Sequence, residues 1–241
     1  MRVEQAIFTS IRGERLDGYQ LAAMSSGVDA ELARRLTPWG PAHDSLLDPS
    51  PGAVSINFHP LDEAWFVLSR TVRQGDEYSG RGGGRIVTHF FLLVRETLER
   101  FANYPLAVLR ALVAAGRTRL PDPIPNRLLS FTLAGRANNP FAGGKEEEEV
   151  DPQALTALAD LVRRESPASV VCSEPAETWL RALFAQLEPE QRLQASFTTG
   201  LRPTACRPFL ISVVPDDPAL LRQSQRTGGT VVHLSQPALA N

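Results

Sequence analysis

The sequence predicts an α+β fold, with antiparallel strands and helices in the first half and a small α/β layer in the second. Strand-like segments with alternating or β-rich composition dominate residues 3–94. After residue 150, capped helices alternate with short apolar segments, which is the pattern of a layered α/β arrangement. The 241 residues are 43% hydrophobic and 22% charged, so the chain can bury a sizeable core.

The first half is expected to contain strands and several short helices. Asp29 is a suitable N-cap for a helix that ends near Leu36, ahead of Pro38. A short helical turn is expected at residues 43–47, where Asp44 would be the cap. The expected strands are at residues 3–11, 18–25, 53–58, 65–72 and 86–94, and two further helices are expected at 95–101 and 105–115.

A stretch rich in proline, glycine and glutamate separates the two halves. Three prolines lie at positions 121, 123 and 125, and the run K-E-E-E-E at residues 145–149 is typical of a solvated linker edge. We therefore predict a first part at residues 1–120, a boundary at 121–150 and a smaller α/β part at 151–241.

The second part alternates helices with strands. Asp151 caps a first helix that starts at Pro152, and Ser173 with Pro175 opens a second. A short third helix is expected from Asp217. The expected strands are at residues 168–172, 194–200, 208–215 and 230–235.

Composition excludes several classes of function. The net charge of −2 and the pI near 6.1 give no basic excess, so nucleic acid is not an expected partner. No apolar run approaches the roughly 20 residues of a membrane span, and the N-terminus lacks the apolar core of a signal peptide. Cys172 and Cys206 are far apart, which favours free thiols in the cytoplasm over a disulfide. No CxxC or HExxH pattern occurs, so we expect neither a metal site nor a cofactor.

A glycine-rich loop carries the most distinctive residues of the chain. Residues 74–85 contain five glycines and lead into a strand, whereas a P-loop leads into a helix. Flanking segments 65–73 and 86–94 are expected to pair as a hairpin. The loop could bind an anion, form a flexible connection or dock a protein, and these interpretations stay open. The candidate binding residues are Arg81, Gly82, Gly83, Gly84, Arg85 and His89.

Three residues suggest a hydrolase as the alternative to a non-enzymatic protein. His89 lies in an apolar strand, where histidines are mostly structural, although it could serve as a base. Ser25 lies in the turn M-S-S-G-V-D but lacks the G-x-S-x-G elbow. His43 and Asp44 form an H-D pair, and a metal hydrolase would need further ligands. These residues do not form a complete catalytic motif, so the sequence favours a non-enzymatic protein.

Several sequence blocks together resemble the N-terminal domain of bacterial GTPase-associated proteins. They are A-I-F-T-S, G-Y-Q-L-A-A-M-S-S-G-V, G-P-A-H-D-S-L-L, S-I-N-F-H-P, E-Y-S-G-R-G-G-G-R-I-V-T-H and, in the segment that follows, L-E-P-E-Q-R-L-Q-A-S-F-T-T-G-L-R-P. The resemblance covers most of residues 5–205. The family's loop commonly reads G-R-x-G-N before a histidine. Arg81 and His89 match this pattern, while Gly84 stands where asparagine is usual.

The resemblance implies a role rather than a reaction. Proteins of this family are encoded beside a small GTPase, in gene clusters thought to act in defence or other biological conflict. The resemblance therefore implies a cytoplasmic, cofactor-free adaptor whose partner is a protein, such as a small GTPase or its complex. Members of the family are usually much longer, so we expect this chain to correspond to an N-terminal module.

Overall fold

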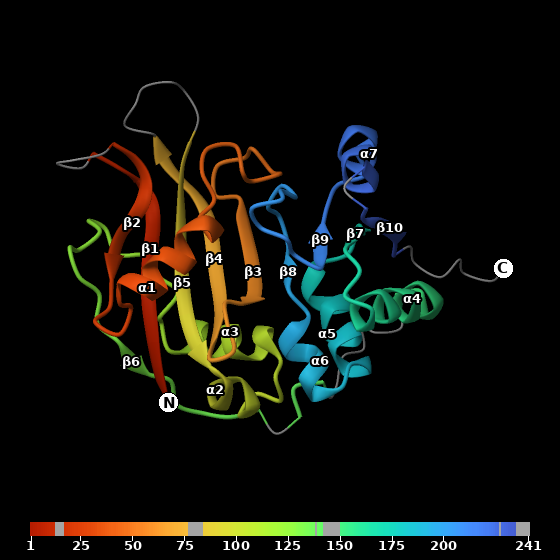
Figure 1. The fold of residues 1–241 in the computed structure, drawn as a ribbon, viewed down its shortest axis with the longest axis horizontal. Helices are drawn as coiled ribbons and strands as arrows, with labels where there is room; N and C mark the ends of the chain where they lie inside the picture. Colours follow the sequence, from red (N-terminus) through yellow and green to blue (C-terminus); the bar gives the residue numbers. More distant parts are fainter. Residues whose placement is uncertain (13–16, 77–83, 138, 142–149, 227, 235–241) are drawn as a thin grey trace.

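The structure, a computed structural model, describes residues 1–12, 17–76, 84–137, 139–141, 150–226 and 228–234. The strands in this part of the chain form one mixed sheet in the order β10-β7-β9-β8-β3-β4-β5-β1-β2, and β6 pairs with β1 (Figure 1). The strands are β1 Arg2–Ile11, β2 Gly18–Met24, β3 Val54–Pro60, β4 Trp65–Asp76, β5 Gly84–Val94, β6 Phe131–Thr132, β7 Ala168–Val171, β8 Phe197–Thr198, β9 Ile211–Val213 and β10 Thr230–His233. The helices are α1 Ala30–Leu36, the 3-10 helix η1 Thr37–Trp39, α2 Arg95–Glu99, α3 Pro105–Ala114, α4 Pro152–Arg163, α5 Ala176–Gln186, α6 Pro189–Gln194 and α7 Pro218–Arg226. The fold is thus α+β, as predicted.

The first half contributes long antiparallel strands. β1 to β5 pair in an antiparallel manner, and β4 and β5 form the predicted hairpin, in which Val67 faces Leu92. The Asp29 carboxylate accepts a hydrogen bond from Leu32 N at 2.8 Å and caps α1, as its position in the sequence predicted. Helices α2 and α3 lie at one end of this part of the sheet (Figure 1).

The second half contributes short parallel strands with helices around them. β8, β9, β7 and β10 pair in parallel, which confirms the small α/β layer. The Asp151 carboxylate accepts a hydrogen bond from Gln153 N at 2.9 Å and caps α4. Helix α6 was not predicted, although Glu188 and Gln191 form a capping box at its start.

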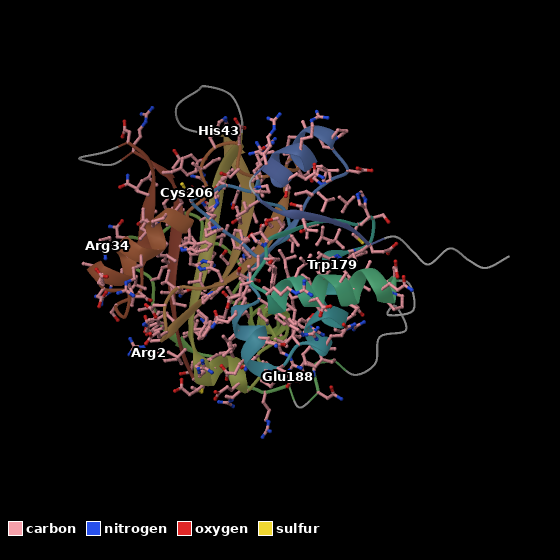
Figure 2. The ribbon with its side chains drawn as sticks, turned by 45° about the vertical axis from the view of Figure 1, so that its right-hand side comes forward. Arg2, Arg34, His43, Trp179, Glu188 and Cys206 are labelled. Atoms are coloured by element: carbon pink, nitrogen blue, oxygen red, sulfur yellow. The ribbon has the colours of Figure 1, made fainter. Side chains whose placement is uncertain are left out.

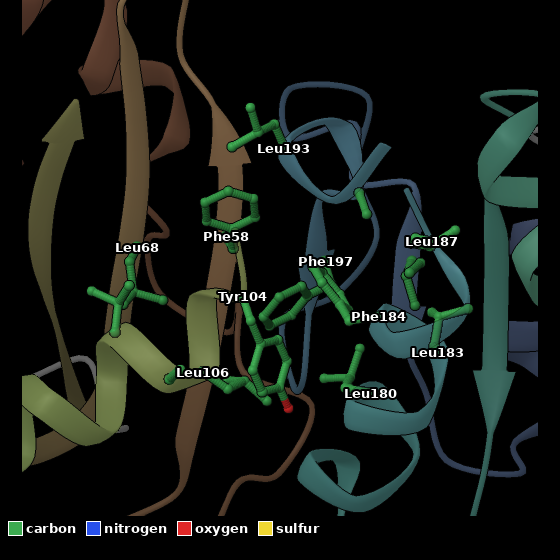
Figure 3. Close-up of a cluster of buried hydrophobic side chains, with 14 of the residues drawn as sticks. Phe58, Leu68, Tyr104, Leu106, Leu180, Leu183, Phe184, Leu187, Leu193 and Phe197 are labelled. Atoms are coloured by element: carbon green, nitrogen blue, oxygen red, sulfur yellow. The ribbon is translucent and has the colours of Figure 1, made fainter. Parts of the chain in front are cut away.

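The two halves meet where β3 pairs with β8, and we call this contact the seam. Asn57 faces Thr198, and Phe58 faces Phe197. The Phe58 and Phe197 ring centroids lie 6.1 Å apart, and Phe197 also packs at 6.0 Å against Phe184 of α5. Figure 3 shows these rings in one cluster with Tyr104 and leucines from both halves. The hydrophobic core therefore continues across the predicted boundary.

Two local predictions differ from the structure. Residues 43–47 form no helical turn: Leu46 bridges to Leu201, and Leu47 N donates to Gly200 O at 2.9 Å. Asp44 has a φ of 60°, which lies outside the helical region. The strands also extend into the glycine-rich segment, because β4 continues to Asp76 and β5 begins at Gly84. Among the described residues, every helix is too short or too polar to cross a membrane.

Candidate functional site

The β4–β5 hairpin extends beyond the rest of the sheet, and we call its end, residues 74–76 and 84–85, the arm. The pairing of β3 with β4 ends at Val72, and the pairing of β1 with β5 ends at Val87. The two strands continue to the pair Asp76 and Gly84, past a bulge that contains Gly75 at a φ of 67°. A bulge with glycine at positive φ increases strand twist, so it redirects the arm relative to the sheet. Figure 1 shows the arm at the upper edge of the sheet.

Three of the predicted binding residues, Arg81, Gly82 and Gly83, lie outside the described residues. Gly84 and Arg85 belong to β5. A Cβ atom at Gly84 would lie 2.5 Å from Arg73 Cγ, so the glycine provides the space that the Arg73 side chain occupies. Arg85 is half-buried, and its Nε has no hydrogen-bond partner among the described residues.

A basic hollow opens at the base of the arm. Its volume is about 880 Å³, and its charged lining consists of Arg70, Arg73, Arg119 and Asp122. Among the described residues, none of these three arginines forms an ion pair within 4.0 Å. The hollow therefore combines three unpaired guanidinium groups with a single carboxylate, and its surface favours an acidic partner.

His89 lies beneath this surface and is buried. Its Nε2 donates to Gln5 Oε1 at 2.8 Å, since an amide oxygen can only accept. Its Nδ1 is buried without a partner among the described residues. Burial, together with the nearby charge of Arg70, lowers the pKa of His89 to about 4. The imidazole is consequently neutral near pH 7.

Ser25 takes part in a turn that is fixed by a carboxylate. Its hydroxyl donates to Glu4 Oε2 at 2.5 Å and accepts from Gln5 N at 2.9 Å. Glu4 Oε2 also accepts from Gly27 N at 3.1 Å, and the other carboxylate oxygen accepts from Arg2 Nε. The hydroxyl is thus hydrogen-bonded to a carboxylate and not to an imidazole, and the same carboxylate is held by Arg2 and by Gly27 N.

His43 lies at the surface, at the same end of the molecule as the arm (Figure 2). Its Nε2 is 3.3 Å from Asp44 Oδ2. The hydrogen bonds of Ser25 and His89 described above involve Glu4 and Gln5, so they do not join these two residues to each other or to His43. Within the described part of the chain, no three His, Cys, Asp or Glu residues converge as metal ligands.

Three of the sequence blocks that carry the resemblance, at residues 40–47, 55–60 and 187–203, meet beside the seam. Sequence reasoning missed this convergence. Arg202 N donates to Ser45 O at 2.8 Å, and Ile56 N donates to Thr199 Oγ1 at 2.9 Å. His59 stacks on Trp39 with ring centroids 3.5 Å apart. The two hydrogen-bonded pairs, Ser45 with Arg202 and Ile56 with Thr199, are well over a hundred positions apart, so no periodicity or motif could have indicated them.

Two family models match successive parts of the chain. Residues 2–129 match the family model described as GTPase-associated protein 1, N-terminal domain type 2. Residues 140–236 match the model described as GTPase-associated protein 1, middle domain. No curated protein and no solved structure shows significant similarity to the chain. The two models together cover nearly all of the sequence, and the chain belongs to the GTPase-associated protein 1 family.

Proposed function

We propose that this chain is a non-enzymatic adaptor that binds a small GTPase, or a complex containing one, through the arm and the basic hollow. The observation that carries the proposal is the set of unpaired arginines at the base of the β4–β5 hairpin. The family name provides the class of partner. The setting would be a cytoplasmic bacterial conflict or signalling system.

The chemistry of arginine suits docking at this surface. The guanidinium plane presents several directed N–H donors, and the aliphatic stem covers apolar surface. Arginine is accordingly enriched among residues that dominate binding energy at interfaces. The glycines at positions 82 and 83 would let the backbone of a partner approach the loop closely. A cytoplasmic setting agrees with the free thiols of Cys172 and Cys206.

The experiment measures binding of the small GTPase encoded beside the gene. The purified GTPase, loaded with GDP or with a non-hydrolysable GTP analogue, is titrated onto the immobilised chain. The triple variant Arg81→Ala, Arg85→Ala, Arg119→Ala should weaken binding by ~2 kcal/mol or more, about 30-fold. Affinity should also fall as salt rises, because exposed charges are screened.

A matched control removes two exposed arginines far from the arm, Arg164 of the α4 C-terminus and Arg222 of α7. Arg164→Ala with Arg222→Ala also removes positive charges, without touching the arm or the hollow, and should leave the affinity unchanged. If the triple variant binds as well as the wild-type chain, the arm is not the docking surface. If the GTPase binds in neither nucleotide state, the adaptor proposal is wrong.

A further inference from the structure

A second cavity lies away from the arm, in the α/β layer. Its volume is about 380 Å³, and it lies between the loop that precedes β9, the starts of β7 and β10, and the end of α7. This volume falls within the range of small-molecule sites. The residues around it include Arg207 but neither aspartate nor glutamate.

Arg207 is the unusual residue of this cavity, because it is a buried cation without a matching anion in the described part of the chain. Its side chain is only 8% exposed. Its Nε has no hydrogen-bond partner among the described residues, and Nη2 makes one long contact, 3.5 Å to Ser45 Oγ. Burial lowers the pKa of Arg207, although an arginine keeps its charge near neutral pH. Burying an unpaired cation is costly, and an anion in the cavity would remove that cost.

The backbone holds Arg207 in place. Arg207 N donates to Thr204 O at 3.1 Å, and Phe209 N donates to Arg207 O at 2.9 Å. The Phe209 ring packs edge-on against Trp39 at 5.3 Å, which fixes one wall of the cavity. The backbone that carries Arg207 and the Phe209 wall are therefore fixed before any ligand arrives, and such preorganisation lowers the entropic cost of binding.

The rest of the lining supplies hydroxyl groups and an apolar wall. Ser169 and Ser212 are paired neighbours on β7 and β9, and the Ser169 and Ser224 hydroxyl oxygens lie 2.6 Å apart. Hydroxyl groups can donate to an oxyanion. Pro203, Pro208 and Phe209 provide apolar surface on the same cavity.

We infer that this cavity binds a small molecule with one oxyanion group, phosphate or carboxylate, on an apolar or aromatic body. Arg207 holds the oxyanion, for which its planar fork suits two parallel N–H···O bonds. The serine hydroxyls complete the contacts to the head group, and Phe209 with the two prolines contacts the body. This site is separate from the arm, so it can exist whether or not the arm binds a GTPase.

The test uses three ring compounds that differ only in head group: phenyl phosphate, benzoate and the neutral benzamide. Each is titrated into the full chain by isothermal titration calorimetry. At least one of the two anions should bind saturably, and the tighter of them identifies the head group. Benzamide should bind ~10-fold more weakly or not at all, because a hydrogen bond to a charged group contributes ~1.5 kcal/mol or more. Absence of binding by both anions, or equal binding by benzamide, would overturn the inference.

Two variants locate the site. Arg207→Gln should weaken anion binding ~10-fold or more, whereas Arg164→Gln, on the surface of α4, should change nothing. Because Arg207 is buried, a second variant leaves it intact: Ala205→Phe places a ring in the cavity from an exposed lining position. It should reduce binding to the same extent. Undiminished anion binding in Ala205→Phe would place the ligand elsewhere and refute the site.

Discussion

Every polar atom of the Asn57 side chain, at the seam, has a hydrogen-bond partner, whereas Arg85 Nε, on the arm, is buried without one among the described residues. Asn57 Oδ1 accepts from the hydroxyls of Ser55 and Thr198 at 2.7 and 2.6 Å. Its Nδ2 donates to Ser69 at 3.1 Å and to Thr71 at 3.3 Å. A fully paired polar network rigidifies and specifies a fold, whereas a polar group without a partner adds nothing to it. The seam should therefore control stability and the arm should control binding.

The largest loss of stability should follow from removing an aromatic ring at the seam. Phe197 is fully buried and contacts both Phe58 and Phe184. Phe197→Ala removes apolar contacts from both halves and leaves a cavity, so the free energy of unfolding should fall by ~3–5 kcal/mol. Urea denaturation measures the change. The control Leu129→Ala, at a side chain that is 80% exposed, should stay within about 0.5 kcal/mol. A loss below about 1 kcal/mol for Phe197→Ala would mean that the halves do not depend on this contact.

Lowering the pH should destabilise the folded chain, because one buried histidine, His59, lies on β3 at the seam and another, His89, lies on β5 beneath the basic hollow. Burial lowers the pKa of His59, on β3, to about 3, and burial with the charge of Arg70 lowers that of His89 to about 4, from 6.5. The unfolded chain takes up protons below about pH 6.5 while the folded chain does not, so stability falls with pH. Between pH 7.5 and pH 5, each histidine should cost ~2 kcal/mol.

Substitution separates the contributions of the two histidines. His89→Gln should remove about half of the histidine-linked loss between pH 7.5 and pH 5, as measured by urea denaturation at each pH. The control Leu129→Ala, at an exposed side chain that does not titrate, should leave the pH dependence unchanged. If His89→Gln leaves the full pH dependence, the imidazole of His89 is not held neutral in the folded chain.

Breaking the polar network at the seam should have an intermediate effect on the free energy of unfolding. Asn57→Ala leaves the buried hydroxyls of Ser55, Thr198, Ser69 and Thr71 with fewer partners. Because unsatisfied buried groups cost about 1–3 kcal/mol, we expect a loss of ~2 kcal/mol in urea denaturation. Asn126→Ala, at an exposed position, is the control and should be neutral. A neutral Asn57→Ala would show that the network adds nothing to the stability of the seam.

Local signals predicted the individual elements of both regions. Asp29 and Asp151 marked the starts of α1 and α4 because a capping carboxylate acts on backbone N–H groups two or three positions away. The capping box of α6, Glu188 with Gln191, was visible in the same way but was overlooked. At Asp44 the sequence wrongly predicted the cap of a helical turn. The bridge between Leu46 and Leu201 determines the backbone there.

Contacts between residues far apart in the chain could not be predicted from the sequence. The contact of Asn57 with Thr198 joins residues 141 positions apart, and no periodicity encodes such a partner. Arg207 likewise lies in a proline-rich segment without a recognisable motif, and its burial depends on Ser45 and on the strands of the α/β layer. The strand composition that predicted the hairpin did not reveal the bulge at Gly75, because an extra residue changes pairing rather than propensity.

Substitutions of the arginines at the arm should have the smallest effect on stability. This result would separate the arm most clearly from the seam. Arg85 is half-buried and makes no hydrogen bond through Nε, so its removal breaks no paired interaction among the described residues. Arg81→Ala with Arg85→Ala should change the free energy of unfolding by no more than about 0.5 kcal/mol. The melting temperature should therefore stay nearly constant while capture of the GTPase is lost. A clear drop in melting temperature would show that these arginines stabilise the fold through a buried ion pair. In that case the arm would resemble the seam, and the docking proposal would have to be abandoned.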